Sequence, residues 1–84
     1  MDKYFVYIAR CADKSLYTGY TIDLKRRETI HNLGCGAVYT RSRRPIKIVY
    51  FEEFTTKKDA LRRERHIKNL KREDKLMLIK KKYF

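Results

Sequence analysis

The sequence predicts a small α+β domain with the element order β-β-α-β-α-α, in which a three-stranded antiparallel sheet is flanked by helices. The chain has 84 residues, which is enough for one hydrophobic core and too few for two. Three short segments are rich in aromatic and β-branched residues, and three others carry residues that start or stop helices. We therefore expect a single domain over residues 1–84, with its motif-bearing part at about residues 4–79.

The first two strands form a predicted hairpin. Residues 4–11 (YFVYIARC) and residues 16–20 (LYTGY) have strand composition, and residues 12–15 (ADKS) between them are expected to form a polar turn. Side chains alternate between the two faces of a sheet. Tyr7 and Tyr17 therefore share a face only if the connection has an odd number of residues or contains a bulge.

A helix and a loop should follow the hairpin. We expect Thr21 to cap the helix, with Asp23 in its first turn near the positive end of the helix dipole. Gly34 and Gly36 predict that the helix ends at residues 32–36. Residues 37–45 (AVYTRSRRP) are expected to form a basic loop, before a third strand over residues 46–54.

Two further helices complete the predicted order. Thr56 and Asp59 form a capping-box pair at the start of the first of them, and the last covers about residues 73–82. The first of these helices has an apolar stripe at helical spacing, made of Ala60, Leu61, Ile67 and Leu70.

Glu64 lies on the same stripe as these apolar residues. A carboxylate that points inward is costly unless it is paired or binds a cation. Two interpretations stay open: a salt bridge to Arg27 or to a neighbouring lysine, and a metal ligand at the edge of the sheet.

The charge of the chain indicates a polyanionic partner. Lys and Arg number 22 against 10 acidic residues, for a net charge of +12, and an excess of this size favours nucleic acid over an anionic membrane surface. No apolar run approaches the roughly 20 residues that span a bilayer. Cys11 and Cys35 lack metal-site spacing. We expect a cytoplasmic monomer with free thiols, no membrane association, no secretion leader and no small-molecule cofactor.

Four side chains near the start of the chain suit phosphodiester chemistry. Tyr7 and Tyr17 supply phenols, and Arg27 and His31 are four residues apart, so that they share one face of the first helix. Taken singly, the tyrosines fit a core or sheet-surface role, and the basic pair fits a solvated helix face. Their combination favours a catalytic site.

The combination resembles a known family. Phe5-Val6-Tyr7, Tyr17-Thr18-Gly19, Arg27, His31 and Glu64 resemble the GIY-YIG nuclease domain in order and in spacing. One departure is Phe5, which stands where the family has the first glycine of its name-giving triplet. The segments at residues 36–45 and 71–79 are similar to the small stand-alone GIY-YIG proteins of bacteria, the UPF0213 group.

This resemblance implies roles for individual residues. Glu64 would bind one divalent cation, Mg²⁺ or Mn²⁺, and Tyr7 or Tyr17 would orient or deprotonate the attacking water. Arg27 would clamp the phosphate, and His31 would assist by hydrogen bonding to a tyrosine or to the phosphate. Gly19 would allow a tight backbone at the site. Asn69 would match a further polar position of the family.

Affinity for nucleic acid is expected from the basic loop. Phosphate contacts are predicted for Arg41, Arg43, Arg44 and Lys47, and base stacking for Tyr39. The alternative for each charge is a solvated surface. The expected function is that of a metal-dependent endonuclease or nicking enzyme that acts on DNA. A catalytically weak nucleic-acid-binding module in DNA repair or recombination is the alternative, and an interaction protein on a nucleoprotein assembly is a third interpretation.

Overall fold

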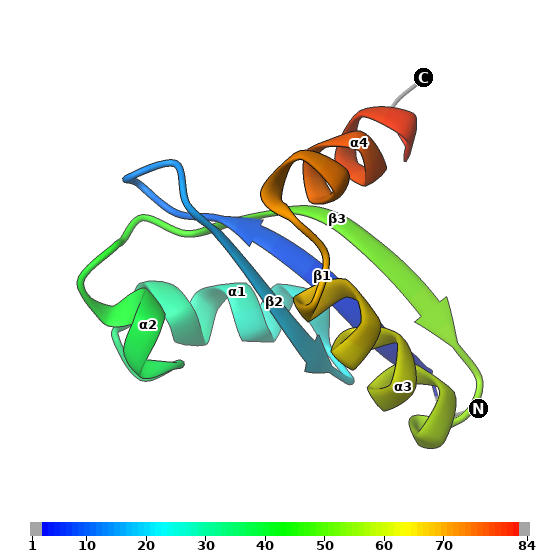
Figure 1. The fold of residues 1–84 in the computed structure, drawn as a ribbon. Helices are drawn as coiled ribbons and strands as arrows, with labels where there is room; N and C mark the ends of the chain where they lie inside the picture. Colours follow the sequence, from blue (N-terminus) through cyan, green and yellow to red (C-terminus); the bar gives the residue numbers. More distant parts are fainter. Residues whose placement is uncertain (1–2, 83–84) are drawn as a thin grey trace.

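The structure, a computed structural model, describes residues 3–82 and has the predicted order of elements with one short helix added (Figure 1). The elements are β1 (Tyr4–Arg10), β2 (Leu16–Thr21), α1 (Leu24–Asn32), α2 (Val38–Arg41), β3 (Lys47–Phe54), α3 (Lys57–Lys68) and α4 (Arg72–Lys82). The predicted α+β class is confirmed. The ends of the predicted domain, residues 1–2 and 83–84, lie outside the described residues.

The sheet has the strand order β2-β1-β3, and both pairings of the central strand are antiparallel. Helices cover the two faces of the sheet, so β1 is buried on both sides. Val6 and Ile8 pack with α3 and α4, whereas Tyr7 and Ala9 lie on the opposite face, in a cluster that Leu24 of α1 joins. The hydrophobic core is thus divided by the sheet into two layers.

The hairpin meets the condition for a shared tyrosine face. Tyr7 pairs with Gly19 and Ala9 pairs with Tyr17, and residues paired across antiparallel strands lie on the same side. The connection between β1 and β2 consists of the five residues 11–15, an odd number. The rings of Tyr7 and Tyr17 accordingly lie on one face, with centroids 6.4 Å apart.

The predicted cap of the first helix is wrong. Thr21 is the last residue of β2, and Asp23 is the N-cap, where its carboxylate accepts a hydrogen bond from the Arg26 N–H at 3.0 Å. The Thr21 hydroxyl instead bonds the backbone of Asp23 at 3.2 Å. Both residue types favour caps, and the extra length of β2 decides between them.

The predicted basic loop also needs correction, because it contains the four-residue helix α2. Its turn is held by Thr40, whose hydroxyl donates to the Ala37 carbonyl at 2.9 Å. Thr40 is fully buried, unlike a residue of a solvated loop.

The apolar stripe of α3 is confirmed in part. Thr56 caps the helix through the Asp59 N–H, and Ala60 and Ile67 are fully buried. Leu61, which we expected on the stripe, is 38% exposed. One residue along a helix is a rotation of about 100°, so Leu61 turns away once Ala60 faces the sheet.

A polar cluster ties α3 to β3. Arg63 bonds both carboxylate oxygens of Glu52, at 2.8 and 2.9 Å, and the Tyr50 hydroxyl donates to the same carboxylate. Burial and the neighbouring carboxylate raise the pKa of Tyr50 to about 12. Between residues 3 and 82, no helix is both long and apolar enough to cross a bilayer.

Candidate active site

Tyr7 and His31 form the centre of the site. The Tyr7 hydroxyl and His31 Nε2 are 2.8 Å apart and share a hydrogen bond. Both side chains are buried, with 1% and 0% of their surface exposed. Tyr7 reaches this point because it lies on the α1 side of the central strand, and His31 because it lies on the face of α1 that packs against the sheet.

Arg27 lies one helical turn before His31 and has an unsatisfied donor. Its Nε is buried without a hydrogen-bond partner, and Thr18 Oγ1 is the other such side-chain atom within residues 3–82. Leaving a buried N–H unpaired is costly, so this donor suits an acceptor that a ligand brings. Arg27 also lines an open hollow of about 340 Å³, together with Thr21, Ile22, Asp23, Arg26 and Ile30.

The environment keeps the central pair uncharged. Burial raises the pKa of Tyr7, although the nearby Arg27 guanidinium partly offsets this, and the charges of Tyr17 and Glu64 add to the rise. Burial also lowers the pKa of His31, and the positive charge of Arg27 lowers it further. Near neutral pH the hydrogen bond therefore joins a phenol to a neutral imidazole.

The lowered pKa of His31 predicts a pH dependence of stability. The unfolded chain takes up a proton at His31 as the pH falls through the ordinary value of 6.5, and the folded chain resists it. Above about pH 6.5, His31 therefore does not reduce the free energy of unfolding. Below that pH, the free energy of unfolding falls as the pH drops toward the folded-state pKa. In thermal melts between about pH 7.5 and 5.5, His31→Gln should weaken this dependence and the exposed-site control His66→Gln should retain it. Equal slopes in both variants would contradict the assignment.

Tyr17 completes an aromatic cluster around the histidine. Its ring centroid lies 5.5 Å from that of His31, edge to face, and the ring stacks on Tyr39 at 6.0 Å. Tyr39 is 40% exposed, so the cluster reaches the surface through this residue. Of the two phenols, Tyr7 is the one hydrogen-bonded to the imidazole.

Glu64 is half-buried and forms an ion pair with a neighbouring lysine. Its carboxylate lies 3.3 Å from Lys68 Nζ, one turn further along α3, and 18% of its side chain is exposed. The salt-bridge interpretation is thus realised with Lys68. Lys68 is half exposed, so the pair is of the weak surface type that a cation can displace.

The donor set around Glu64 fits Mg²⁺ better than a transition metal. Residues 3–82 contain no group of three or more His, Cys, Asp or Glu side chains placed to share an ion. Mg²⁺ is commonly bound by one or two carboxylates, with water and substrate phosphate completing its octahedron. Glu64 supplies one such carboxylate, and its charge contributes to the raised pKa of Tyr7, so the carboxylate lies within electrostatic reach of the candidate site.

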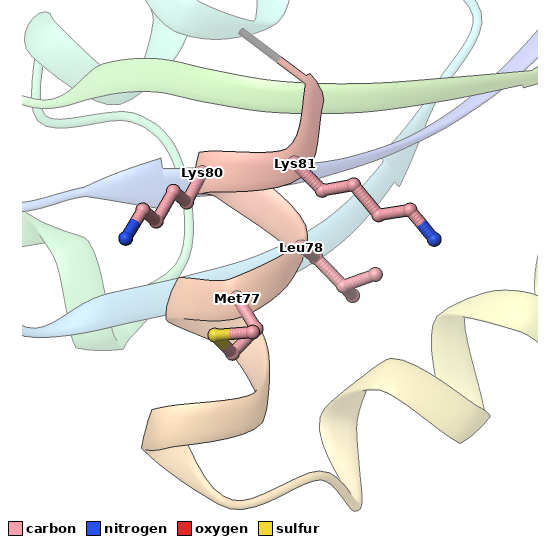
Figure 2. Close-up of a pocket in the computed structure, with 4 residues that line it drawn as sticks. All are labelled: Met77, Leu78, Lys80 and Lys81. Carbon is pink, nitrogen blue, oxygen red and sulfur yellow. The ribbon is translucent and has the colours of Figure 1, made fainter. Parts of the chain in front are cut away.

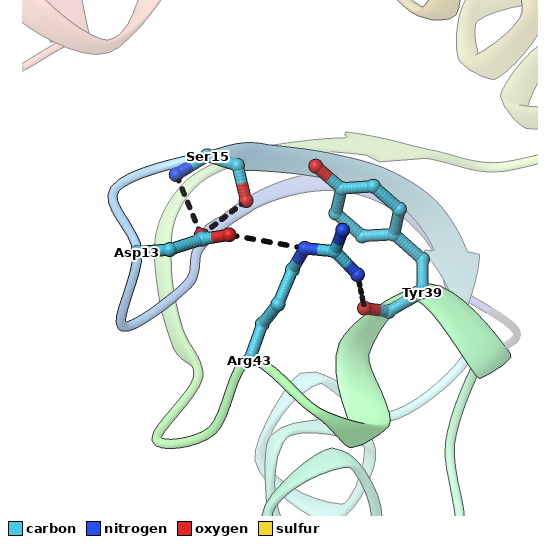
Figure 3. Close-up of polar contacts among 4 residues, drawn as sticks. All are labelled: Asp13, Ser15, Tyr39 and Arg43. Atoms are coloured by element: carbon cyan, nitrogen blue, oxygen red, sulfur yellow. Dashed lines mark hydrogen bonds and ion pairs between the residues drawn. The ribbon is translucent and has the colours of Figure 1, made fainter.

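Two of the four residues predicted to contact phosphate, Arg43 and Arg44, form hydrogen bonds within the protein. Figure 3 shows Arg43 between the hairpin tip and α2, with Nε 3.0 Å from the Asp13 carboxylate and one terminal nitrogen 2.7 Å from the Tyr39 carbonyl. Its guanidinium also lies 4.0 Å from the centroid of the Tyr39 ring. Arg44 donates to the carbonyls of Arg41 and Asn32.

The remaining predicted contacts are more open. Arg41 and Lys47 are exposed on either side of the segment that joins α2 to β3. Asn69 is exposed and forms the C-cap of α3, where its backbone N–H bonds the carbonyls of Arg65 and His66. Both thiols are free, with Cys11 buried and Cys35 exposed.

Two glycines keep space for the central pair. A Cβ at Gly19 would overlap the Tyr7 phenol, with Cε2 at 2.9 Å and the hydroxyl nearer still. A Cβ at Gly36 would lie 2.9 Å from His31 Cε1 and closer to Nδ1. From the sequence, Gly36 indicates a helix end, and both Gly36 and Thr40 lie in the segment that resembles the UPF0213 group, but neither has a predicted role at the site.

A separate hollow lies on α4. Met77, Leu78, Lys80 and Lys81 line it, and Figure 2 shows the two lysine side chains extending in opposite directions from the helix. Its described lining residues carry two amines and none of the acids, phenols or imidazoles that phosphodiester cleavage uses. The tyrosine cluster is therefore the better candidate site.

Comparison with known proteins identifies the family of the chain. The family model described as the GIY-YIG catalytic domain matches residues 3–78. The UPF0213 protein CPE1444 of Clostridium perfringens is 55% identical over 78 residues, covering 93% of this chain and 84% of that protein. The UPF0213 protein SSP2268 of Staphylococcus saprophyticus is 53% identical, covering 94% and 96%.

Two solution NMR structures are similar to the chain. The UPF0213 protein BH0048 from Bacillus halodurans superposes with a TM-score of 0.60 at 44% identity, covering 93% of this chain and 83% of that one. The protein EF2693 from E. faecalis gives a TM-score of 0.64 at 35% identity, covering 99% and 92%. The family model matches nearly the whole of this chain, and the first two relatives are about half identical to it. The chain therefore belongs to the GIY-YIG family, among its small UPF0213 proteins.

Proposed function

We propose that the protein is a Mg²⁺-dependent endonuclease or nicking enzyme that cleaves phosphodiester bonds in DNA. The family is one of nuclease domains, and the observation that carries the proposal is the Tyr7–His31 hydrogen bond beside the unsatisfied Nε of Arg27. Together these groups offer a proton acceptor and a phosphate clamp in one place.

Each residue has a distinct role in the proposed reaction. Arg27 binds the scissile phosphate and stabilises the negative charge that develops on its oxygens in the transition state. Tyr7 deprotonates the attacking water after its own proton has passed to His31 Nε2. The lowered pKa of His31 opposes this transfer, and the Arg27 guanidinium favours it by stabilising the phenolate of Tyr7. Tyr17 packs against both rings and orients the water. A Mg²⁺ ion at Glu64, when bound, would neutralise charge on the phosphate oxygens.

Binding of the polyanion rests on exposed positive charge. Arg41 and Lys47 are exposed, and we propose that they supply phosphate contacts that do not read sequence. The Tyr39 ring is partly covered by Arg43, so we propose that a base stacks against the outer part of the Tyr17–Tyr39–Arg43 group. We propose a monomer that acts in the cytoplasm, where its two thiols remain reduced.

The proposal is tested by incubating the protein with supercoiled plasmid, branched duplex, single-stranded DNA and RNA, each with Mg²⁺, Mn²⁺ or EDTA. We expect nicked DNA that requires a divalent ion and is not formed by Arg27→Ala. Arg26→Ala, on the same helix and lining the same hollow, controls for loss of positive charge and should retain more cleavage. Cleavage in EDTA, or equal cleavage by Arg27→Ala, would contradict the proposal.

A nucleic-acid-binding module with little catalysis is the second candidate. The Glu64–Lys68 ion pair favours it, because a cation must compete with Lys68 for the carboxylate. This candidate predicts a salt-sensitive gel shift, no cleavage with either metal, and binding that Tyr17→Phe leaves unchanged.

A further inference from the structure

His31 is held at both of its ring nitrogens by hydroxyl groups. Nε2 lies 2.8 Å from the Tyr7 hydroxyl, and Nδ1 lies 2.9 Å from Thr40 Oγ1. His31 and Thr40 are fully buried. The protonation pattern of the ring is therefore determined by these two partners rather than by bulk water.

The hydrogen of the Thr40 hydroxyl is already used elsewhere. Thr40 Oγ1 donates to the Ala37 carbonyl at 2.9 Å, within the turn of α2. A hydroxyl has one hydrogen, so toward His31 the same oxygen is only an acceptor. His31 Nδ1 must then carry a hydrogen, and in a neutral imidazole Nε2 has none. The Tyr7 hydroxyl is left as the donor to Nε2.

We propose that Thr40 is a positioning residue, whose hydroxyl holds His31 in the tautomer that leaves Nε2 free to accept the proton of Tyr7. The geometry disfavours the opposite tautomer. If Thr40 donated to Nδ1, its oxygen and the Ala37 carbonyl oxygen would lie 2.9 Å apart with no hydrogen between them. Two acceptors at that separation repel each other.

The charges around the ring support the neutral form that this tautomer requires. The titratable groups that act on His31 are Tyr7 from β1, Tyr17 from β2 and Arg27 from α1. Arg27 and burial together lower the pKa of His31, so the ring is unprotonated before the reaction.

The inference deepens the proposed function and rests on it for its catalytic meaning. When Tyr7 acts as base, its O–H bond breaks and an N–H bond forms at His31 Nε2, which gives a phenolate and an imidazolium with no change in their summed charge. The phenolate then takes a proton from the attacking water, and the imidazolium releases its proton to the leaving oxygen or to solvent. In the opposite tautomer Nε2 already carries a hydrogen, so the first transfer is blocked.

The tautomer is measured directly by NMR of ¹⁵N-labelled full-length protein, from the ring nitrogen shifts and their couplings to the ring hydrogens. The chain has two histidines, and the exposed His66 serves as the internal reference. Near pH 7.5 we expect wild type and Thr40→Ser to show hydrogen on Nδ1 of His31. Thr40→Val, which keeps the shape but loses the hydroxyl, should move hydrogen to Nε2, and Thr40→Ala replaces it if the valine variant does not fold. Hydrogen on Nε2 in wild type, or hydrogen kept on Nδ1 without the hydroxyl, would overturn the proposal.

Cleavage rates supply the second readout. Thr40→Ser should retain the wild-type rate within a few-fold, and Thr40→Val should lose about 10- to 100-fold, as when partners that orient a functional histidine are removed. The loss should persist at saturating DNA, since positioning acts on kcat rather than on KM. If wild type cleaves nothing, the proposed function fails, and the tautomer measurement alone still decides the role of Thr40.

Discussion

Replacing Glu64 with glutamine should abolish metal-dependent cleavage while leaving the fold intact. The amide keeps the size of the carboxylate but lacks its negative charge, so the predicted affinity for the cation should be lost. A loss of at least about 10³-fold in cleavage rate is expected, which corresponds to roughly 4 kcal/mol of transition-state stabilisation. The measurement is single-turnover nicking as a function of Mg²⁺ concentration, alongside thermal melting.

The controls separate loss of the cation from loss of a surface ion pair. Glu64→Gln also breaks the contact with Lys68, so Lys68→Ala is the matched variant, which removes the pair but keeps the carboxylate. Lys68→Ala should bind the cation at least as well as wild type, because the competing amine is gone. Glu73→Gln, an exposed acid at the start of α4, should behave as wild type. Full activity in Glu64→Gln would rule out this residue as the metal ligand.

Adding a single methyl group at Gly36 should damage both stability and activity. The new Cβ would lie within 3.0 Å of three atoms of the His31 ring. The ring is fully buried and hydrogen-bonded at both nitrogens, so it cannot move without breaking one of these bonds. Overpacking of this kind costs about 1–3 kcal/mol of unfolding free energy, measurable by urea denaturation.

A double-mutant cycle identifies the cause of that loss. In the His31→Ala background the ring is absent, so Gly36→Ala should cost much less than in wild type, with a coupling energy of about 1 kcal/mol or more. If the two substitutions are instead additive, the cost arises from the backbone and the ring has no part in it. Cleavage by Gly36→Ala alone should also fall, since the Tyr7–His31 geometry is disturbed.

The sequence predicted the parts of the site that depend on parity and periodicity. Strand alternation linked the two phenols to an odd-numbered connection, and helical spacing placed Arg27 and His31 on one face; both relations depend only on counting residues. Residue type alone could not choose between Thr21 and Asp23 as a cap, because both are favourable and the choice depended on where β2 ends.

The missed features depend on contacts between segments. The α2 turn is stabilised by the bond between Thr40 and Ala37 and by the burial of Thr40 against His31, and a four-residue helix has little periodicity of its own. The sequence does not determine the partner of Glu64 for a related reason. Several cations lay within reach along the chain, and only the structure selects Lys68.

The contact between Asp13 and Arg43 has a consequence for how binding responds to salt. An arginine that is already paired with a carboxylate contributes less to phosphate binding than a free arginine, because the phosphate must first displace the carboxylate. The slope of log affinity against log salt concentration counts phosphates that are newly neutralised, at about 0.9 for each on duplex DNA. Asp13 at the hairpin tip thus competes with phosphate for Arg43. On binding DNA, the chain should therefore release fewer counterions than its number of arginines suggests.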